Sequence, residues 1–327
     1  ANRITRYDYD LQDRLVKLTA ADGGITLYAY NTEGRLSYVQ DPRGLRTTYA
    51  TNGFGDVTSQ TRPDSGVTTY AYDSAGRLAT LTRADGTATT TTWDRLDRMT
   101  SRTAGSTTET FTYDAGTDGK GRLTGLIDAS GQTTWTYDDT GALLSQTNTI
   151  LDTTYTTTWT YDAQGRLAAL AYPGGPTLAY AYDAHGRVSR VTSSLTGAWA
   201  TLADSMLYQP ATDSPYARRL GNGLARLITL DTDARIAALA SPNVHSLAFG
   251  YDTTDTLDSL ADGVVPALNA SFTYDGADRL KSVTRSGDAQ SFGWDKTGNR
   301  TSHNRAAAAN TYASSSTSNR LASISGS

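Results

Sequence analysis

A short pattern recurs about every 21 residues along this chain of 327 residues. Each copy has a β-prone run that ends in Tyr-Asp, a turn that ends in Gly-Arg-Leu, and a second short run closed by Asp-Gly or a related pair. A unit this short cannot bury a core of its own and must be stabilised by its neighbours. The pattern therefore predicts a single array of about fifteen repeats over residues 1–327, in place of the two ordinary domains that length suggests.

The positions that define the repeat are an aromatic residue, the aspartate that follows it, and the Gly-Arg-Leu triplet that closes the turn. We predict a structural role for these residues, since they recur in phase along the whole chain. The clearest of these signature residues are Tyr9, Asp10, Tyr30, Tyr72, Asp73, Gly76, Arg77, Leu78, Tyr137, Asp138, Tyr161, Asp162, Gly165, Arg166, Leu167, Tyr182, Asp183, Gly186, Arg187, Tyr251, Asp252, Tyr274, Asp275, Arg279 and Leu280.

The local chemistry of one copy is that of a β-hairpin. Residues 68–72 read Thr-Thr-Tyr-Ala-Tyr, which favours a strand, and aromatic residues two apart lie on one face of it. The aspartate after the second aromatic can accept hydrogen bonds from nearby backbone N–H groups, and the glycine of the turn tolerates positive φ. Pairs such as Asp22-Gly23 mark the opposite turn. Each repeat is therefore expected to supply two antiparallel strands with a row of aromatic side chains on one face.

The apolar residues of the second strand sit three apart, as in Leu78/Leu81 and Leu167/Leu170. This spacing cannot keep both residues on one face of a regular strand. We predict that the first leucine belongs to the turn or that a β-bulge follows it.

Composition limits the fold. The chain is 38% hydrophobic and has 20 Tyr against 5 Phe and 2 Met, too few large apolar residues for a thick sandwich core or a helical bundle. About thirty strands cannot lie in one flat sheet, because strand twist accumulates. The predicted fold is all-β, an antiparallel meander of hairpins that curls into a spiral sheet or a shell. A seven-bladed propeller, with two repeats per blade, also fits the arithmetic.

Two stretches break the rhythm. Residues 192–219 have weak turn signals and are predicted to be an irregular insertion or a degenerate repeat. Residues 302–318 are rich in Ala, Ser, Thr and Asn and are predicted to be a low-complexity loop. Insertions in repeat arrays map to loops, where specific contacts are frequent. A decayed repeat and a plain connector are the simpler interpretations.

No catalytic constellation stands out. His185, His245 and His303 lie far apart in sequence, and nearly all aspartates recur at turn positions where a structural role explains them. Calcium-binding and phosphate-binding loop motifs are absent from the sequence, as is cysteine. We therefore predict no catalytic residue, no metal, no cofactor and no enzymatic activity; an enzyme formed by residues 192–219 is a weaker hypothesis.

The charge pattern argues against two kinds of partner. The net charge is −4, and arginine recurs once per repeat, so it is dispersed and does not form a basic patch for nucleic acid. No apolar run approaches the roughly 18 residues that a membrane-spanning helix needs. We predict neither nucleic-acid binding nor a membrane span.

The motif Tyr-Asp-x-x-Gly-Arg-Leu, clearest at residues 72–78 and 161–167, resembles the YD repeat of the RHS (rearrangement hotspot) family. That family includes bacterial polymorphic toxins, the C components of insecticidal Tc toxin complexes, wall-associated proteins and the animal teneurins. The resemblance implies a long sheet that spirals into a hollow cocoon, which in the toxins holds a C-terminal toxin domain. It also implies secretion or a place on the bacterial cell surface, with the remainder of a larger RHS protein and its enclosed toxin domain as partners.

Two details bear on this resemblance. The chain starts in mid-pattern at Ala1 without an initiating methionine, which suggests a piece of something longer. RHS toxins end their core with an Asp-Pro-x-Gly cleavage motif, and the match here, Asp41-Pro42-Arg43-Gly44, lies near the start between two repeats. We interpret it as a turn with proline at its second position, not as a cleavage site.

The functional hypothesis is a structural shell segment that encapsulates a C-terminal toxin domain and helps to deliver it. The alternative is an extracellular repeat module that binds carbohydrate or a partner protein through its aromatic rows, as stacked Tyr and Trp can. Packing between strands requires the same aromatic spacing, so the spacing does not by itself favour a glycan ligand.

Overall fold

The computed structural model describes residues 3–197, 200–306 and 308–326. Within them lie thirty β-strands and one short 3₁₀ helix, and no α-helix occurs in these ranges. The chain divides into two compact units. Unit 1 consists of Ala1–Ala88 and Phe249–Ser327, and unit 2 of Thr89–Ala248.

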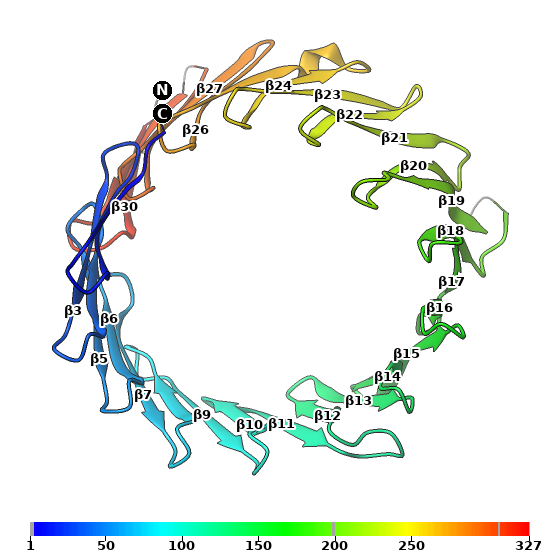
Figure 1. Ribbon diagram of the computed structural model, residues 1–327, viewed down its shortest axis with the longest axis horizontal. Coiled ribbons are helices and arrows are strands. Elements are labelled where there is room, and N and C mark those ends of the chain that lie inside the picture. Colours follow the sequence, from blue (N-terminus) through cyan, green and yellow to red (C-terminus); the bar gives the residue numbers. More distant parts are fainter. Residues whose placement is uncertain (1–2, 198–199, 307, 327) are drawn as a thin grey trace. The chain divides into compact units, whose positions relative to one another are not determined.

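Unit 2 contains one uninterrupted antiparallel ladder in which every strand pairs with the next strand in the sequence. In Figure 1 its strands, coloured from cyan through green to yellow, follow one another along a bent sheet. They are β9 (Ala88–Trp93), β10 (Met99–Ala104), β11 (Thr107–Tyr113), β12 (Leu123–Asp128), β13 (Gly131–Tyr137), β14 (Leu143–Ile150), β15 (Thr153–Tyr161), β16 (Leu167–Ala171), β17 (Thr177–Tyr182), β18 (Val188–Ser193), β19 (Thr201–Tyr208), β20 (Pro215–Leu220), β21 (Ala225–Leu230), β22 (Ile236–Ser241) and β23 (His245–Tyr251).

Unit 1 contains two such ladders, one from each end of the chain. The first is β1 (Arg6–Tyr9), β2 (Leu15–Thr19), β3 (Ile25–Tyr30), β4 (Leu36–Gln40), β5 (Arg46–Thr51), β6 (Val57–Arg62), β7 (Gly66–Tyr72) and β8 (Leu78–Thr82). The second is β24 (Leu257–Asp262), helix η2 (Pro266–Leu268), β25 (Ala270–Tyr274), β26 (Leu280–Arg285), β27 (Asp288–Trp294), β28 (Arg300–Arg305), β29 (Ala308–Ser314) and β30 (Leu321–Gly326).

Several strands alternate between half-buried and exposed residues. Along β7, Tyr70 and Tyr72 lie on the half-buried face, while Thr69 and Ala71 are exposed. The buried apolar residues among those described are three alanines, and no large side chain in the described part of the chain is fully buried. Both faces of the sheet are therefore partly exposed to solvent. Stability is therefore spread over many half-buried contacts between neighbouring strands, with no central core.

The predicted bulge in the second strand is confirmed, and it explains the leucine spacing. Tyr161 pairs with Leu167, and Thr160 pairs with Ala169, so Ala168 is the extra residue. Skipping one residue restores the two-residue period. Leu170 then pairs with Trp159, and both leucines meet the aromatic side chains of the preceding strand on one face.

The predicted loop over residues 302–318 is wrong for most of its length. Residues 300–305 form β28 and residues 308–314 form β29, which pair with each other. Burial alternates along β29, with Tyr312 half-buried and Thr311 and Ala313 exposed. Small polar residues do not mark a loop here. Thr and Ser fit the exposed face of a strand just as Tyr fits its half-buried face, so a run rich in them can still form a strand.

The irregular stretch 192–219 contains a degenerate repeat. It includes β19 and β20, which pair antiparallel with two shifts of register, on either side of Leu207. Ser205 has φ of 52°, in the left-handed region. The all-β antiparallel meander predicted from the sequence is confirmed, and the propeller is wrong, because the ladder of unit 2 is continuous where blades would separate it into four-stranded sheets.

Candidate functional site

The signature turn is a closed network of backbone hydrogen bonds. In residues 161–167 the Asp162 N–H donates to the Arg166 carbonyl at 2.8 Å, and the Gly165 N–H donates to the Asp162 carbonyl at 2.9 Å. Gly165 has φ of 75°. A type I turn followed by a left-handed glycine is a common way to join two strands of a hairpin. The sequence spacing of Asp and Gly reflects this requirement.

The aspartate side chain holds the turn from the side. Its Oδ1 accepts hydrogen bonds from the N–H groups of Gln164 at 3.0 Å and Arg166 at 2.9 Å, and its Oδ2 accepts one from Arg166 Nε at 2.7 Å. The Arg166 side chain is the main cause that holds the pKa of Asp162 below its ordinary value. The carboxylate is thus committed to its turn, as expected for a structural residue.

The tyrosine connects one repeat to the next. The Tyr182 hydroxyl donates to the Leu167 carbonyl of the preceding repeat at 2.8 Å. The Arg166 guanidinium lies over the same ring, 4.3 Å from its centroid, a cation–π contact. Equivalent hydroxyl bonds join Tyr30 to Leu15, Tyr72 to Val57, Tyr113 to Met99, Tyr137 to Leu123, Tyr161 to Leu143, Tyr208 to Val188 and Tyr274 to Leu257.

The arginine therefore has two partners: the aspartate of its own turn and the aromatic ring of the next repeat. The same arrangement places Arg14 over Tyr30, Arg98 over Tyr113 and Arg187 over Tyr208. Sequence reasoning identified the position of the arginine but missed its second partner. One signal was available. The arginine directly precedes the leucine, and the carbonyl of that leucine accepts the hydrogen bond from the tyrosine of the next repeat.

The structure does not gather the signature residues into one site. It repeats one constellation of Tyr, Asp, Gly, Arg and Leu along the sheet, with variations. Tyr9 on the first strand is 58% exposed. The turn after Asp252 has Thr256 in place of arginine, and the Thr256 hydroxyl donates to Asp252 at 2.7 Å. The predicted signature residues are thus distributed along the sheet and make the contacts of its turns.

A second polar network, absent from the sequence predictions, joins the two ladders of unit 1. We call it the seam. The Arg43 guanidinium donates to the Ser318 carbonyl at 2.8 Å and to Asn319 Oδ1 at 2.9 Å. The Asn319 side chain donates to Asp41 at 2.8 Å, and its N–H donates to Asp64 at 2.6 Å. Turns near the two ends of the chain are therefore held together.

Further contacts lengthen the seam. Arg279 reaches Asp22 at 3.0 Å while also binding Asp275 of its own turn. Arg3 reaches Asp252 at 3.5 Å and Asp278 at 2.5 Å. These partners are 249 or more residues apart, since 257 separates Asp22 from Arg279 and 249 separates Arg3 from Asp252. Nothing in the repeat pattern indicates which turns meet.

The sequence around Asp41 forms a turn, as predicted. The Asp41 N–H donates to the Leu45 carbonyl and the Gly44 N–H to the Asp41 carbonyl, each at 2.9 Å. The Asp41 carboxylate accepts the N–H groups of Arg43 and Leu45. The proline motif thus replaces an ordinary Asp-Gly turn and presents Arg43 to the seam.

Searches of the described residues for other kinds of site gave negative results. No group of three or more His, Cys, Asp or Glu residues in these ranges is arranged to hold a metal ion. None of the helical segments described is long and apolar enough to cross a membrane.

Comparison with known proteins finds both a family model and solved structures that resemble this arrangement. Residues 57–205 match the model of the Teneurin YD-shell family. Among solved structures, a chain of the TcdB2–TccC3 complex superposes with a TM-score of 0.88 at 19% sequence identity, and the match covers 98% of this chain. A Tc holotoxin pore of Photorhabdus luminescens with a mutation in TccC3 gives a TM-score of 0.86, again at 19% identity over 98% of this chain.

The chain spans about a fifth of the length of these solved chains, since each match covers 20% of the other protein. TcdB2–TccC3 without its hypervariable C-terminal region matches with a TM-score of 0.85. No curated protein sequence gives a significant match. Residues 57–205 thus match the Teneurin YD-shell family, and the hairpin ladders have the RHS shell fold of the solved structures.

Proposed function

We propose that this chain is part of a shell that encloses another segment of a larger polypeptide. The observation that carries the proposal is the match to TcdB2–TccC3, which extends over 98% of the chain with a TM-score of 0.88. One of the matched structures lacks a hypervariable C-terminal region of its protein. By analogy, the enclosed segment would be a C-terminal toxin domain, and the whole protein would be secreted or displayed on a bacterial cell surface.

The construction of the sheet supports a role as a wall. A single layer of hairpins needs only its neighbours for stability, so it can be extended without a thick core. Its conspicuous side chains are committed to scaffold contacts: Asp162 to its own turn, and Tyr182 to Leu167 and Arg166. Residues with these contacts stabilise the fold and are not free to act on a substrate.

The alternative, a carbohydrate-binding module, finds less support. A sugar would stack on the faces of exposed aromatic rings. In several repeats an arginine already lies over one face of the tyrosine, as Arg98 does over Tyr113 at 4.4 Å. The aromatic spacing thus follows from contacts between repeats.

Limited proteolysis of the complete natural polypeptide that contains residues 1–327 tests the proposal. We expect mass spectrometry to find a segment outside the array that resists protease while the array is intact. The variant Trp159→Ala removes a half-buried side chain from β15 and should expose that segment to digestion. Thr160→Ala, on the exposed face of the same strand, is the matched control and should leave protection unchanged.

Two results would contradict enclosure. One is a polypeptide in which every segment outside the array is digested at the same rate with or without Trp159→Ala. The other is a protected segment whose protection persists when residues 1–327 are removed. Binding of residues 1–327 to a glycan array, lost on substitution of exposed aromatic residues, would favour the carbohydrate-binding module.

A further inference from the structure

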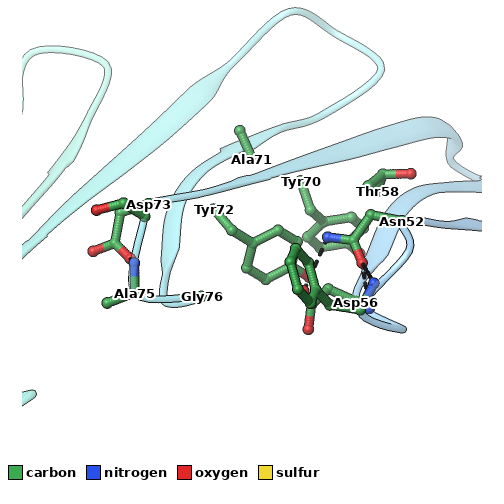
Figure 2. Close-up of a pocket in the computed structure, with 11 residues that line it drawn as sticks. Asn52, Asp56, Thr58, Tyr70, Ala71, Tyr72, Asp73, Ala75 and Gly76 are labelled. Atoms are coloured by element: carbon green, nitrogen blue, oxygen red, sulfur yellow. Dashed lines mark hydrogen bonds between the residues drawn. The ribbon is translucent and has the colours of Figure 1, made fainter.

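An open pocket of about 610 Å³ lies in unit 1 between two consecutive signature turns. Figure 2 shows the Tyr72 ring pointing toward the turn that contains Asn52 and Asp56. Phe54, which is 94% exposed, also lines the pocket, together with residues 73–76 of the next turn. The pocket therefore has aromatic walls and two carboxylates, Asp56 and Asp73, and among its lining residues none is basic.

The pocket occupies the place that an arginine takes in other repeats. Over Tyr182 this place is filled by Arg166, the residue before the leucine that accepts the tyrosine hydroxyl bond. Over Tyr72 the corresponding residue is Asp56, directly before Val57. The substitution removes the guanidinium and reverses the charge beside the ring.

The local electrostatics favour a cation. Burial and then the charge of Asp56 raise the pKa of Tyr72. The Asp56 carboxylate accepts a hydrogen bond from the Asn52 side chain at 2.9 Å. In the part of the chain that the structure describes, no arginine or lysine pairs with it. A carboxylate has about four lone-pair positions, so Asp56 retains capacity for a second donor.

The chain itself shows how such a position can be filled from outside the repeat. The turn that begins at Asp252 has Thr256 at the arginine position, and Arg3 approaches Asp252 from a distant segment at 3.5 Å. The turn that begins at Asp295 has Asn299 at that position, and Arg43 approaches Asp295 at 3.9 Å. In these two turns, an arginine from a segment far away in sequence thus approaches the aspartate that has no arginine in its own turn.

We propose that the Asp56 pocket binds the guanidinium of an arginine side chain presented by another polypeptide segment. The planar group would stack on Tyr72, as Arg166 does on Tyr182, and donate to the Asp56 carboxylate. Lysine fits less well, since it has neither the flat face nor the forked donors. This proposal does not depend on enclosure, because an arginine of any docking segment satisfies the same chemistry.

NMR titration of residues 1–327 with N-acetyl-arginine amide tests the proposal. Backbone amide shifts should be confined to residues 52–56 and 72–76. The same titration with N-acetyl-citrulline amide, which is neutral and nearly isosteric, should give at least about fivefold weaker binding, since both the cation–π and the ionic contact are lost. Equal shifts with citrulline, or no shifts in these residues at millimolar probe, would overturn the proposal.

Variants of Asp56 separate binding from folding. Asp56→Asn keeps the shape and should weaken arginine binding about fivefold or more. Asp56→Arg should restore the arginine of the other repeats, abolish binding of the probe and raise the melting temperature. Asp13→Asn, at an exposed turn of another repeat, is the control and should bind like the unchanged chain. If Asp56→Asn binds arginine as tightly as this control, the pocket is not an arginine site.

Discussion

At the scale of single residues, a signature arginine contacts both its own turn and the aromatic ring of the next repeat. Arg166 fixes Asp162 within its turn and covers the Tyr182 ring of the next repeat. The motif could be recognised in the sequence because these residues have fixed spacing. The contact with the next repeat could not be deduced, because the ring lies 16 residues further on, and the hairpin geometry had to be known first.

The hydroxyl of the repeat tyrosine should contribute measurably to stability. Tyr182→Phe keeps the ring under Arg166 but removes the donor to the half-buried Leu167 carbonyl. We expect a loss of about 1 kcal/mol in the free energy of unfolding, the usual value for one hydrogen bond. Urea denaturation provides the measurement, and Tyr155→Phe on exposed β15, which lacks such a bond, should be nearly neutral. Equal effects would argue against the hydroxyl bond as the cause.

The carboxylates of the turns should determine the acid limit of stability. Two hydrogen bonds from Arg98, at 3.0 and 2.8 Å, are the main cause that lowers the pKa of Asp114 from 3.8 to about 2. Because the folded state holds the proton more weakly than the unfolded state, this contribution is complete above about pH 5 and is lost as the pH falls toward 2.

Asp114→Asn should therefore lower the melting temperature at neutral pH, and the difference from the unchanged chain should shrink between about pH 4 and pH 2. Asparagine tolerates the positive φ of 66° at this position, so the change tests charge and not backbone strain. Asp139→Asn, at an exposed turn position, is the control. A difference that stays constant down to pH 2 would contradict an ionic origin.

At the scale of the hairpin, the sequence contained most of the information. The repeat of Asp and Gly predicted the turns, and the three-residue leucine spacing predicted the bulge, because both are local properties of the backbone. Residues 302–318 were misjudged for the opposite reason. Their strands β28 and β29 are recognised by pairing with neighbours and not by composition.

The turn glycine should matter through its backbone angle alone. A Cβ on Gly165 would meet no atom within 4 Å, yet φ is 75°. Gly165→Ala should cost about 1 kcal/mol for the left-handed conformation. The chain provides the reverse experiment at Ala234, which has φ of 63° at the equivalent position, so Ala234→Gly should stabilise by a similar amount. Thermal or urea unfolding of both variants checks this, and effects of the same sign would contradict it.

At the scale of the larger assembly of repeats, unit 1 depends on contacts that the repeat pattern does not encode. The seam links Arg43 to Ser318 and Asn319, and Arg279 to Asp22, across more than 250 residues of sequence. The side chains that form it, arginine and aspartate, are also those of every ordinary turn. Their partners follow from which turns the folded sheets bring together, so sequence spacing alone cannot identify them.

Removing Arg43 should loosen the seam without unfolding the ladders. In Arg43→Ala we expect faster hydrogen exchange in residues 315–320 and 41–45, because the donors to Ser315, Ser318 and Asn319 are lost. Exchange within β26 and β27 should stay unchanged. Arg305→Ala removes an exposed pair with Asp288 and serves as the control. Exchange that rises throughout unit 1 would mean that the seam is required for folding of the ladders themselves.

The scarcity of fully buried large side chains among the described residues has a consequence for how such a protein can diversify. Each repeat contributes only modestly to the stability of the sheet. One repeat can therefore lose its signature arginine, as at Asp56, Ala142 and Thr256, while its neighbours preserve the sheet. Substitutions within a single repeat are thus tolerated, whereas a similar substitution in a densely packed core would unfold the protein. Redundancy of this kind gives the array spare positions on which new specificities can evolve.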